Sequence, residues 1–118
     1  MKTQLRTASI ALAVAALFSS SAVLAQTVVR IGHVAPMTGG IAHLGKDNEN
    51  GAKLAIADLN KAGLTIGGQK VKFELLSEDD AADPKQGTAA AQKLVDAKVA
   101  GVIGHLNSGT TIPASTPL

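Results

Sequence analysis

The feature that most constrains this 118-residue chain is the alternation of short apolar runs with longer helical patterns. The runs cover residues 27–34, residues 70–76 or 77, and residues 99–103. The first and third are typical of strands buried on both faces, whereas the second alternates apolar and polar residues and predicts a strand near a sheet edge. The order β-α-β-α-β predicts an α/β fold with a parallel sheet.

The first helical pattern covers roughly residues 46–62. Its apolar residues recur at helical spacing and would form one face: Ala52, Ala55, Ile56 and Leu59. Gly63 follows, at the position where a glycine commonly ends a helix. The polar residues 47–50 (DNEN) would fall in the first turn, where we expect capping and solvation rather than catalysis.

The second helix has a stronger start signal, Asp83-Pro84-Lys85-Gln86. It combines an N-cap acceptor, a proline at the first helical position and a glutamine at the third. This helix should end near Ala97 or Lys98, and one face should hold Gly87, Ala91, Leu94 and Val95. The acidic cluster of residues 78–80 and 83 matches no calcium-loop pattern, so capping is the better use for Asp83.

Three loops should meet at the carboxyl edge of such a sheet: residues 35–45, 78–83 and 105–111. That edge is where open parallel sheets bind ligands. In the third loop, Gly109, Thr110 and Thr111 resemble the start of a helix, whose hydroxyl and N–H groups would suit a small anion or carboxylate. A strand end followed by a solvated turn is the alternative interpretation.

The first 25 residues have the layout of a secretory signal peptide. Lys2 and Arg6 precede an apolar run over residues 8–18, and a small-residue segment ends at Ala25, after which we expect cleavage. An uncleaved membrane anchor is the alternative. Lys2 and Arg6 would leave with the signal, so nine basic and nine acidic residues remain and nothing suggests a nucleic-acid partner. The chain has no cysteine, so disulfides and lipid attachment at cysteine are excluded.

Little in the sequence supports catalysis or cofactor binding. His33, His43 and His105 show no zinc spacing, and no dinucleotide or phosphate-loop glycine pattern is present, so we expect neither a metal nor a cofactor. Ser108 and His105 could be imagined with an acid as a hydrolytic triad, but Ser108 is not in a G-x-S-x-G elbow. A binding role, which needs only preorganised donors and acceptors, is favoured over an enzyme.

Four stretches resemble the N-terminal lobe of periplasmic leucine/isoleucine/valine-binding proteins, which serve ABC importers. They are residues 31–39 (IGHVAPMTG), 45–60 (GKDNENGAKLAIADLN), 78–86 (EDDAADPKQ) and 102–115 (VIGHLNSGTTIPAS). The resemblance covers nearly all of residues 28–115. It implies a two-lobed type I periplasmic-binding clamshell that closes on an amino acid and then docks on a permease in the inner membrane.

The resemblance also implies site residues. The serine matching Ser108 contacts the α-carboxylate of the ligand in this family, and Asn107, Gly109 and Thr110 are adjacent candidates for the wall. Leu44 stands where well-known members have an aromatic residue that lines the side-chain pocket, so the ligand can differ. Cysteines that some members have at the positions of Ala82 and Asn107 are absent.

Family members continue far beyond Leu118, so we expect residues 26–118 to be a truncated first lobe. An amino-acid-binding component of an importer is the leading hypothesis. A relative that binds an amide or an aromatic acid, a secreted α/β enzyme, and a truncated product that binds no ligand remain as alternatives.

Overall fold

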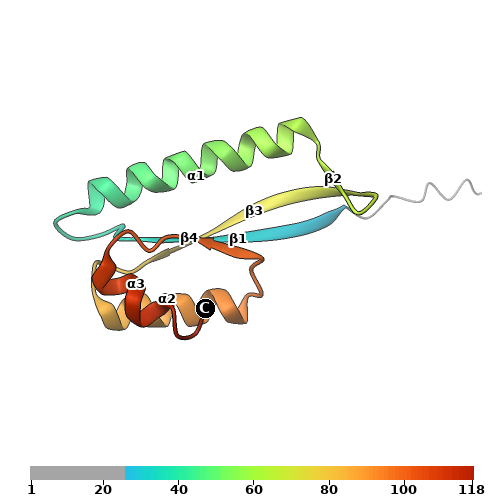
Figure 1. Ribbon diagram of the computed structural model, residues 1–118. Coiled ribbons are helices and arrows are strands. Elements are labelled where there is room, and N and C mark those ends of the chain that lie inside the picture. Colours follow the sequence, from blue (N-terminus) through green and yellow to red (C-terminus); the bar gives the residue numbers. More distant parts are fainter. Residues whose placement is uncertain (1–25) are drawn as a thin grey trace, which may run out of the picture.

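A computed structural model describes residues 26–118 of the chain. Its elements, in order, are β1 (Thr27–Ala35), α1 (Ala42–Ala62), β2 (Thr65–Ile66), β3 (Gln69–Asp79), α2 (Pro84–Asp96), β4 (Gly101–Ile103) and α3 (Ser108–Ala114). They form three layers, with α1 on one face of the sheet and α2 and α3 on the other (Figure 1). The α/β class and the β-α-β-α-β order are confirmed.

The sheet has the strand order β2-β3-β1-β4. Strand β1 is parallel to β3, from Thr27 opposite Val71 to Ala35 opposite Asp79, and parallel to β4 on its other side. The two-residue β2 pairs antiparallel with the start of β3. The predicted parallel sheet is therefore confirmed, and the second predicted strand does lie towards one side of it.

The core lies between the sheet and α2. Val34, Ala90 and Leu94 form its buried cluster, and the partly buried Leu76, Val99 and Val102 pack against it. Gly32 lets α2 come close, because a Cβ there would lie 2.7 Å from Leu94 Cδ1. Full burial of a leucine contributes about 1.5–3 kcal/mol, so Leu94 is a principal anchor of this layer.

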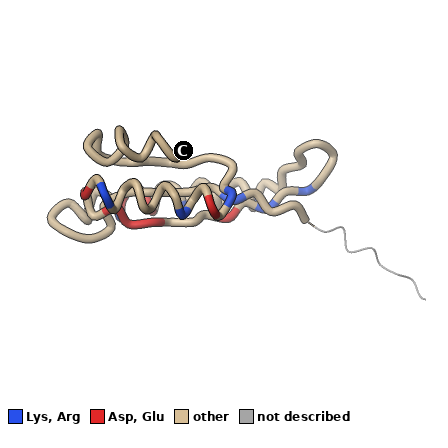
Figure 2. Tube along the Cα trace, turned by 90° about the horizontal axis from the view of Figure 1, so that it is seen from below, with Lys and Arg blue, Asp and Glu red and all other residues tan. Residues whose placement is uncertain are grey.

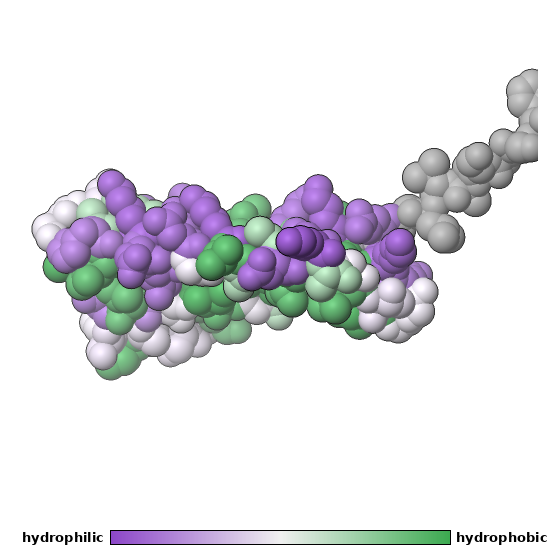
Figure 3. Space-filling model, turned by 90° about the horizontal axis from the view of Figure 1, so that it is seen from above, coloured by the Kyte–Doolittle hydropathy of each residue, from purple (hydrophilic) through white to green (hydrophobic). Residues whose placement is uncertain are grey.

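The α1 layer is held partly by polar contacts. The Asn60 side chain donates to the carbonyl of Phe73 at 2.9 Å and accepts its N–H at 2.7 Å, so an amide takes the place of a neighbouring strand along β3. The apolar face of α1 is only partly covered: Ala52 is buried, but Leu59 is 37% exposed. The face of the molecule on the α1 side carries many hydrophilic residues, and apolar residues lie beside them (Figure 3).

Two helix ends were predicted correctly. The Asp83 carboxylate accepts the N–H groups of Lys85 and Gln86, and Pro84 is the first residue of α2. Gly63 has the left-handed conformation, φ 66° and ψ 51°, that suits glycine after a helix. Of the residues expected on one face of α2, Gly87, Ala91 and Leu94 are buried, whereas Val95 is 39% exposed.

The predicted start of α1 at residue 46 is wrong. The helix begins at Ala42, so the polar residues 47–50 lie beyond its first turn, which contains no acidic residue. They do not cap the helix: Asn48 Oδ1 accepts a 2.8 Å hydrogen bond from His33 Nε2, and Glu49 forms an ion pair with Lys53. In the first turn of α1, Gly45 packs directly against the backbone of Pro36.

Strand boundaries also differ from the prediction. Strand β3 runs to Asp79, which places Glu78 and Asp79 in the strand rather than in the loop. Strand β4 begins at Gly101 and not at residue 99, because Val99 still closes the α2 end through a bond from its N–H to the Leu94 carbonyl. Residues 66–69 form the tight end of the antiparallel β2–β3 hairpin.

Among residues 26–118, no helix is long and apolar enough to cross a membrane. The predicted signal peptide of residues 1–25 lies outside the described residues.

Candidate functional site

Three loops gather at one edge of the sheet. They follow β1, β3 and β4 and precede α1, α2 and α3, respectively. Because the three strands are parallel, their carboxyl ends lie at the same edge, at the left of Figure 1. The structure therefore places the three predicted loops together.

Asp79, the last residue of β3, joins the first two loops. Its Oδ1 accepts the N–H of Met37 at 2.7 Å and that of Ala81 at 2.8 Å, and its Oδ2 accepts the Thr38 hydroxyl at 2.6 Å. Burial raises the pKa of Asp79, but the hydrogen bonds from Thr38 and from the backbone outweigh it, so this pKa lies below its ordinary value. The carboxylate form holds the β1–α1 loop against the β3–α2 loop.

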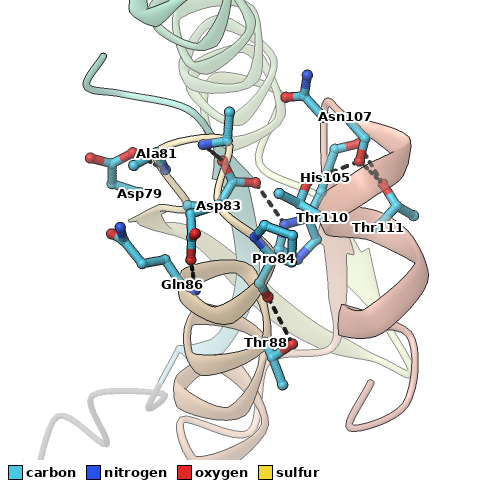
Figure 4. Close-up of polar contacts among 12 residues, drawn as sticks. Asp79, Ala81, Asp83, Pro84, Gln86, Thr88, His105, Asn107, Thr110 and Thr111 are labelled. Atoms are coloured by element: carbon cyan, nitrogen blue, oxygen red, sulfur yellow. Dashed lines mark hydrogen bonds and ion pairs between the residues drawn. The ribbon is translucent and has the colours of Figure 1, made fainter.

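Asp80, the next residue, joins the second loop to the third. Its Oδ2 lies 2.8 Å from His105 Nδ1, and its Oδ1 accepts the N–H of Ala82 at 2.9 Å. The Asp80 residue is fully buried and His105 is 9% exposed. Figure 4 shows His105 reaching from its own loop towards the β3–α2 loop.

The turn before α3 is stabilised by threonine hydroxyls. Thr110 and Thr111 both donate to the carbonyl of Asn107, at 2.9 and 2.8 Å, and Thr111 also donates to the carbonyl of His105. The Asn107 amide points away from these contacts (Figure 4), and its Oδ1 is buried with no hydrogen-bond partner in the described part of the chain. Ser108 and Gly109, the first residues of α3, are exposed.

The predicted binding residues thus differ in their availability. Ser108 and Gly109 are open to solvent, Asn107 is half-buried, and Thr110 is fully buried with its hydroxyl already bonded. Leu44 is 47% exposed and lies in the first turn of α1, whereas Ser108 is the first residue of α3. The two helices lie on opposite faces of the sheet (Figure 1).

Charge is sparse around the third loop. Residues 99–118 contain no Lys, Arg, Asp or Glu, and the corresponding tube in Figure 2 has no coloured segment. A ligand anion would therefore meet dipoles and hydroxyls here rather than a cation from this segment. Helix α3 has only seven residues, so its backbone dipole would contribute little to binding an anion. The Ser108 hydroxyl is therefore the stronger candidate for the group that binds a ligand carboxylate.

The arrangement does not assemble a nucleophile. His105 has a carboxylate partner in Asp80, but in the described residues no hydrogen bond joins His105 to the Ser108 hydroxyl, and His105 Nε2 is buried without a partner. Within residues 26–118 no three His, Cys, Asp or Glu side chains are grouped so as to hold a metal ion.

The contacts of Asp79 and Asp80 were missed by sequence reasoning, which assigned a specific role only to Asp83. A usable signal was present, because a carboxylate at the end of one parallel strand can reach loops that follow the strands beside it. The register of β3 against β1 is needed, however, to predict which of Asp79 and Asp80 reaches which loop.

An α/β lobe whose loops converge at the carboxyl edge of a parallel sheet is typical of a ligand-binding lobe. The model of the periplasmic binding protein family matches residues 28–116. The chain belongs to this family, and its similarity to leucine/isoleucine/valine-binding members is confirmed by curated relatives.

Two of these relatives illustrate the match. The Leu/Ile/Val-binding protein BraC3 of Rhizobium johnstonii is 43% identical over 95 residues, which cover 80% of this chain and 25% of BraC3. An amino acid binding protein of Pseudomonas aeruginosa is 44% identical over 107 residues, which cover 90% of this chain and 28% of that protein. The chain thus spans about a quarter of the length of the curated relatives it matches.

Solved structures agree. LivJ of Streptococcus pneumoniae, a branched-chain amino acid transporter substrate-binding protein in complex with isoleucine, has a TM-score of 0.68 at 28% identity and covers 77% of this chain and 26% of LivJ. A solute-binding protein of an ABC transporter from Rhodopseudomonas palustris, in complex with 3,4-dihydroxybenzoic acid, has a TM-score of 0.61 at 36% identity, over 75% of this chain and 23% of that one. Over the residues that these structures cover, the chain therefore has the fold of a type I periplasmic-binding lobe.

Proposed function

We propose that residues 26–118 form part of the first lobe of a periplasmic solute-binding protein that delivers a branched-chain or related amino acid to an ABC-transporter permease. The observation that carries the proposal is the exposed Ser108, which lies at the carboxyl edge of the sheet in a chain of this family. The names of the relatives and the isoleucine complex of LivJ support the ligand class. Residues 1–25 would direct export and be cleaved after Ala25.

In this proposal the ligand carboxylate accepts a hydrogen bond from the Ser108 hydroxyl. Gly109 and Asn107 line the same wall, Thr110 supports it from beneath, and Leu44 contributes an apolar surface from α1. The remainder of such a protein would supply the second lobe. Ligand contacts made in both lobes would favour the closed state, which is the form that a permease recognises.

An aromatic acid is the second candidate ligand. The R. palustris protein, 36% identical to this chain, was solved with 3,4-dihydroxybenzoic acid. Both ligand classes carry a carboxylate, so Ser108 can serve either one. The pocket for the ligand side chain must therefore discriminate between amino acids and aromatic acids. The aliphatic Leu44 in its wall is compatible with either class.

A chimaera tests the proposal, because the chain matches only a quarter of its relatives. Residues 28–116 replace the matching segment of BraC3, and isothermal titration measures leucine, isoleucine, valine and 3,4-dihydroxybenzoate. We expect saturable binding of at least one of them. A folded chimaera that binds none would refute the proposal.

Ser108→Ala in the chimaera should weaken binding about tenfold or more, since a hydrogen bond to a charged group contributes about 1.5–3 kcal/mol. Ser115→Ala is the matched control. Ser115 is also an exposed serine of this segment, but its hydroxyl donates to the Ile112 carbonyl at the far end of α3. Equal losses in the two variants would argue against a carboxylate site at Ser108.

A further inference from the structure

Asp80 and His105 form a buried contact between the β3–α2 loop and the loop that leads to Ser108. Their side chains are 0% and 1% exposed, and Asp80 Oδ2 lies 2.8 Å from His105 Nδ1. Neither the cap of α2, which uses Asp83, nor the first turn of α3, which uses threonine hydroxyls, requires this contact. The presence of this buried polar pair therefore calls for an explanation other than helix capping.

The surroundings of His105 determine where its proton lies. Its Nδ1 faces the Asp80 carboxylate, whereas its Nε2 is buried and has no hydrogen-bond partner among residues 26–118. A proton on Nε2 would be a buried donor without an acceptor, which is costly. The geometry therefore favours the tautomer in which Nδ1–H donates to Asp80.

The backbone that follows His105 has little freedom to move independently. The carbonyls of His105 and Asn107 both accept the Thr111 hydroxyl, at 3.2 and 2.8 Å. Beneath them, a Cβ added to Gly87 of α2 would lie 3.1 Å from Thr110 Cβ and 3.5 Å from His105 Cε1. The imidazole, the turn and the start of α3 thus pack on α2 as one unit, and a shift of His105 would displace Ser108.

We infer that Asp80 is a positioning residue: through His105 it fixes the turn that presents Ser108 to the ligand. The inference rests on the proposed function for the role of Ser108. It adds a residue that touches no ligand and lies in a different loop. Asp79 and Asp83 bind backbone N–H groups and the Thr38 hydroxyl instead, so neither can replace Asp80 in this role.

A carboxylate is required at position 80, because each of its oxygens accepts a different N–H. One accepts from Ala82 and the other from His105. An asparagine would present its NH₂ to one of these donors, so the loop or the imidazole must move, or the His105 proton must shift to the buried Nε2, which has no acceptor among residues 26–118. Asp80→Asn is therefore nearly isosteric yet should disturb the turn, and Asp83→Asn is the matched control in the same loop.

Nuclear magnetic resonance on the product of the full 118-residue chain tests the contact without any ligand. Long-range ¹H–¹⁵N spectra should show His105 protonated at Nδ1 and unprotonated at Nε2. Asp80→Asn should abolish this signature and shift the amide signals of residues 107–110, whereas Asp83→Asn should leave both unchanged. An Nε2-protonated His105 in the unmutated chain would overturn the inference, even if Asp80→Asn failed to fold.

The BraC3 chimaera tests the consequence for binding. Asp80→Asn should weaken ligand affinity about tenfold, but less than twofold when Ser108→Ala is already present, because the effect passes through Ser108. A general loss of folding would not produce this dependence. Equal effects in both backgrounds would overturn the positioning role. If the chimaera bound nothing, the proposed function would fail, while the resonance experiment would still decide the Asp80–His105 contact.

Discussion

Gly45→Ala should destabilise this fold, although alanine is the better helix former. Gly45 is buried in the first turn of α1, and a Cβ there would collide with the backbone carbonyl oxygen of Pro36. The neighbouring atoms are backbone, so no side-chain rotation can relieve the collision. Either α1 or the β1–α1 loop must shift.

The size of the effect follows from two opposing terms. Replacing glycine by alanine inside a helix contributes about 1 kcal/mol of stability. Forcing an extra methyl group into a packed site typically costs about 1–3 kcal/mol, and here the obstacle is a carbonyl that cannot rotate away. We expect the second term to exceed the first and the net loss to be about 2 kcal/mol.

Gly51→Ala is the matched control in the same helix. A Cβ at Gly51 would meet nothing within 4 Å, so only the helix-propensity term applies and stability should rise by about 1 kcal/mol. Thermal unfolding followed by circular dichroism measures both variants. Since 1 kcal/mol corresponds to about 4–8 °C for a domain of this size, Gly51→Ala should raise Tm and Gly45→Ala should lower it by roughly twice as much.

The result has a bearing on the site. The Gly45 contact sets where α1 begins and so holds Leu44 and the β1–α1 loop at the carboxyl edge. A Gly45→Ala variant as stable as Gly51→Ala would refute the reasoning. It would mean that the loop yields at no cost and that the start of α1 is not fixed by packing.

Three further changes test the supports of the sheet edges. Asp83→Ala removes the cap of α2 and should cost about 1 kcal/mol in urea unfolding. Asn60→Ala should cost about 1–2 kcal/mol by the same measurement, because it removes two hydrogen bonds to the Phe73 backbone. The lowered pKa of Asp79 implies that its carboxylate stabilises the fold above about pH 4, its value when unfolded, and that this stability is lost as pH falls through the folded value. In the Asp79→Asn variant, the free energy of unfolding should therefore fall less steeply as the pH is lowered below about 4. An unchanged pH dependence would contradict the stabilising role of the Asp79 carboxylate.

Local signals in the sequence predicted some features well. The Asp83-Pro84 start of α2 and the Gly63 end of α1 depend on only a few adjacent residues, and both are confirmed. The β2–β3 hairpin had a local signal too. Gly67 and Gly68 both adopt positive φ, 59° and 80°, as a glycine pair in a tight hairpin turn allows, but the β2 strand before them has only two residues.

Other features depend on contacts between distant residues. The start of α1 follows from the packing of Gly45 on Pro36, and in sequence Gly39, Gly40 and Gly45 resemble a loop. Val95 is 39% exposed, and helical periodicity alone does not determine how far neighbouring elements cover a helix face. In the candidate site, the convergence of three loops was predictable from strand order, whereas the Asp80–His105 contact was not, because it needs the register of β3 against β1.

That register explains how two adjacent aspartates serve different loops. Successive side chains of a strand point to opposite faces. In β3, Phe73 lines one pocket together with Ala52 and Ile56 of α1, and Glu78 forms an ion pair with Lys93 of α2. Asp79 therefore falls on the α1 face, where the β1–α1 loop lies, and Asp80 falls on the face that α2 and α3 cover.

A slip of β3 by one residue against β1 would exchange the two faces. The Asp79 carboxylate would then face α2 and α3, and the β1–α1 loop would lose its acceptor for the Met37 N–H and the Thr38 hydroxyl. The pairing of Ala35 with Asp79 in the sheet thus determines which loop each carboxylate holds. Since α2 packs on the same face as Asp80, the core around Leu94 and the turn before Ser108 depend on one register.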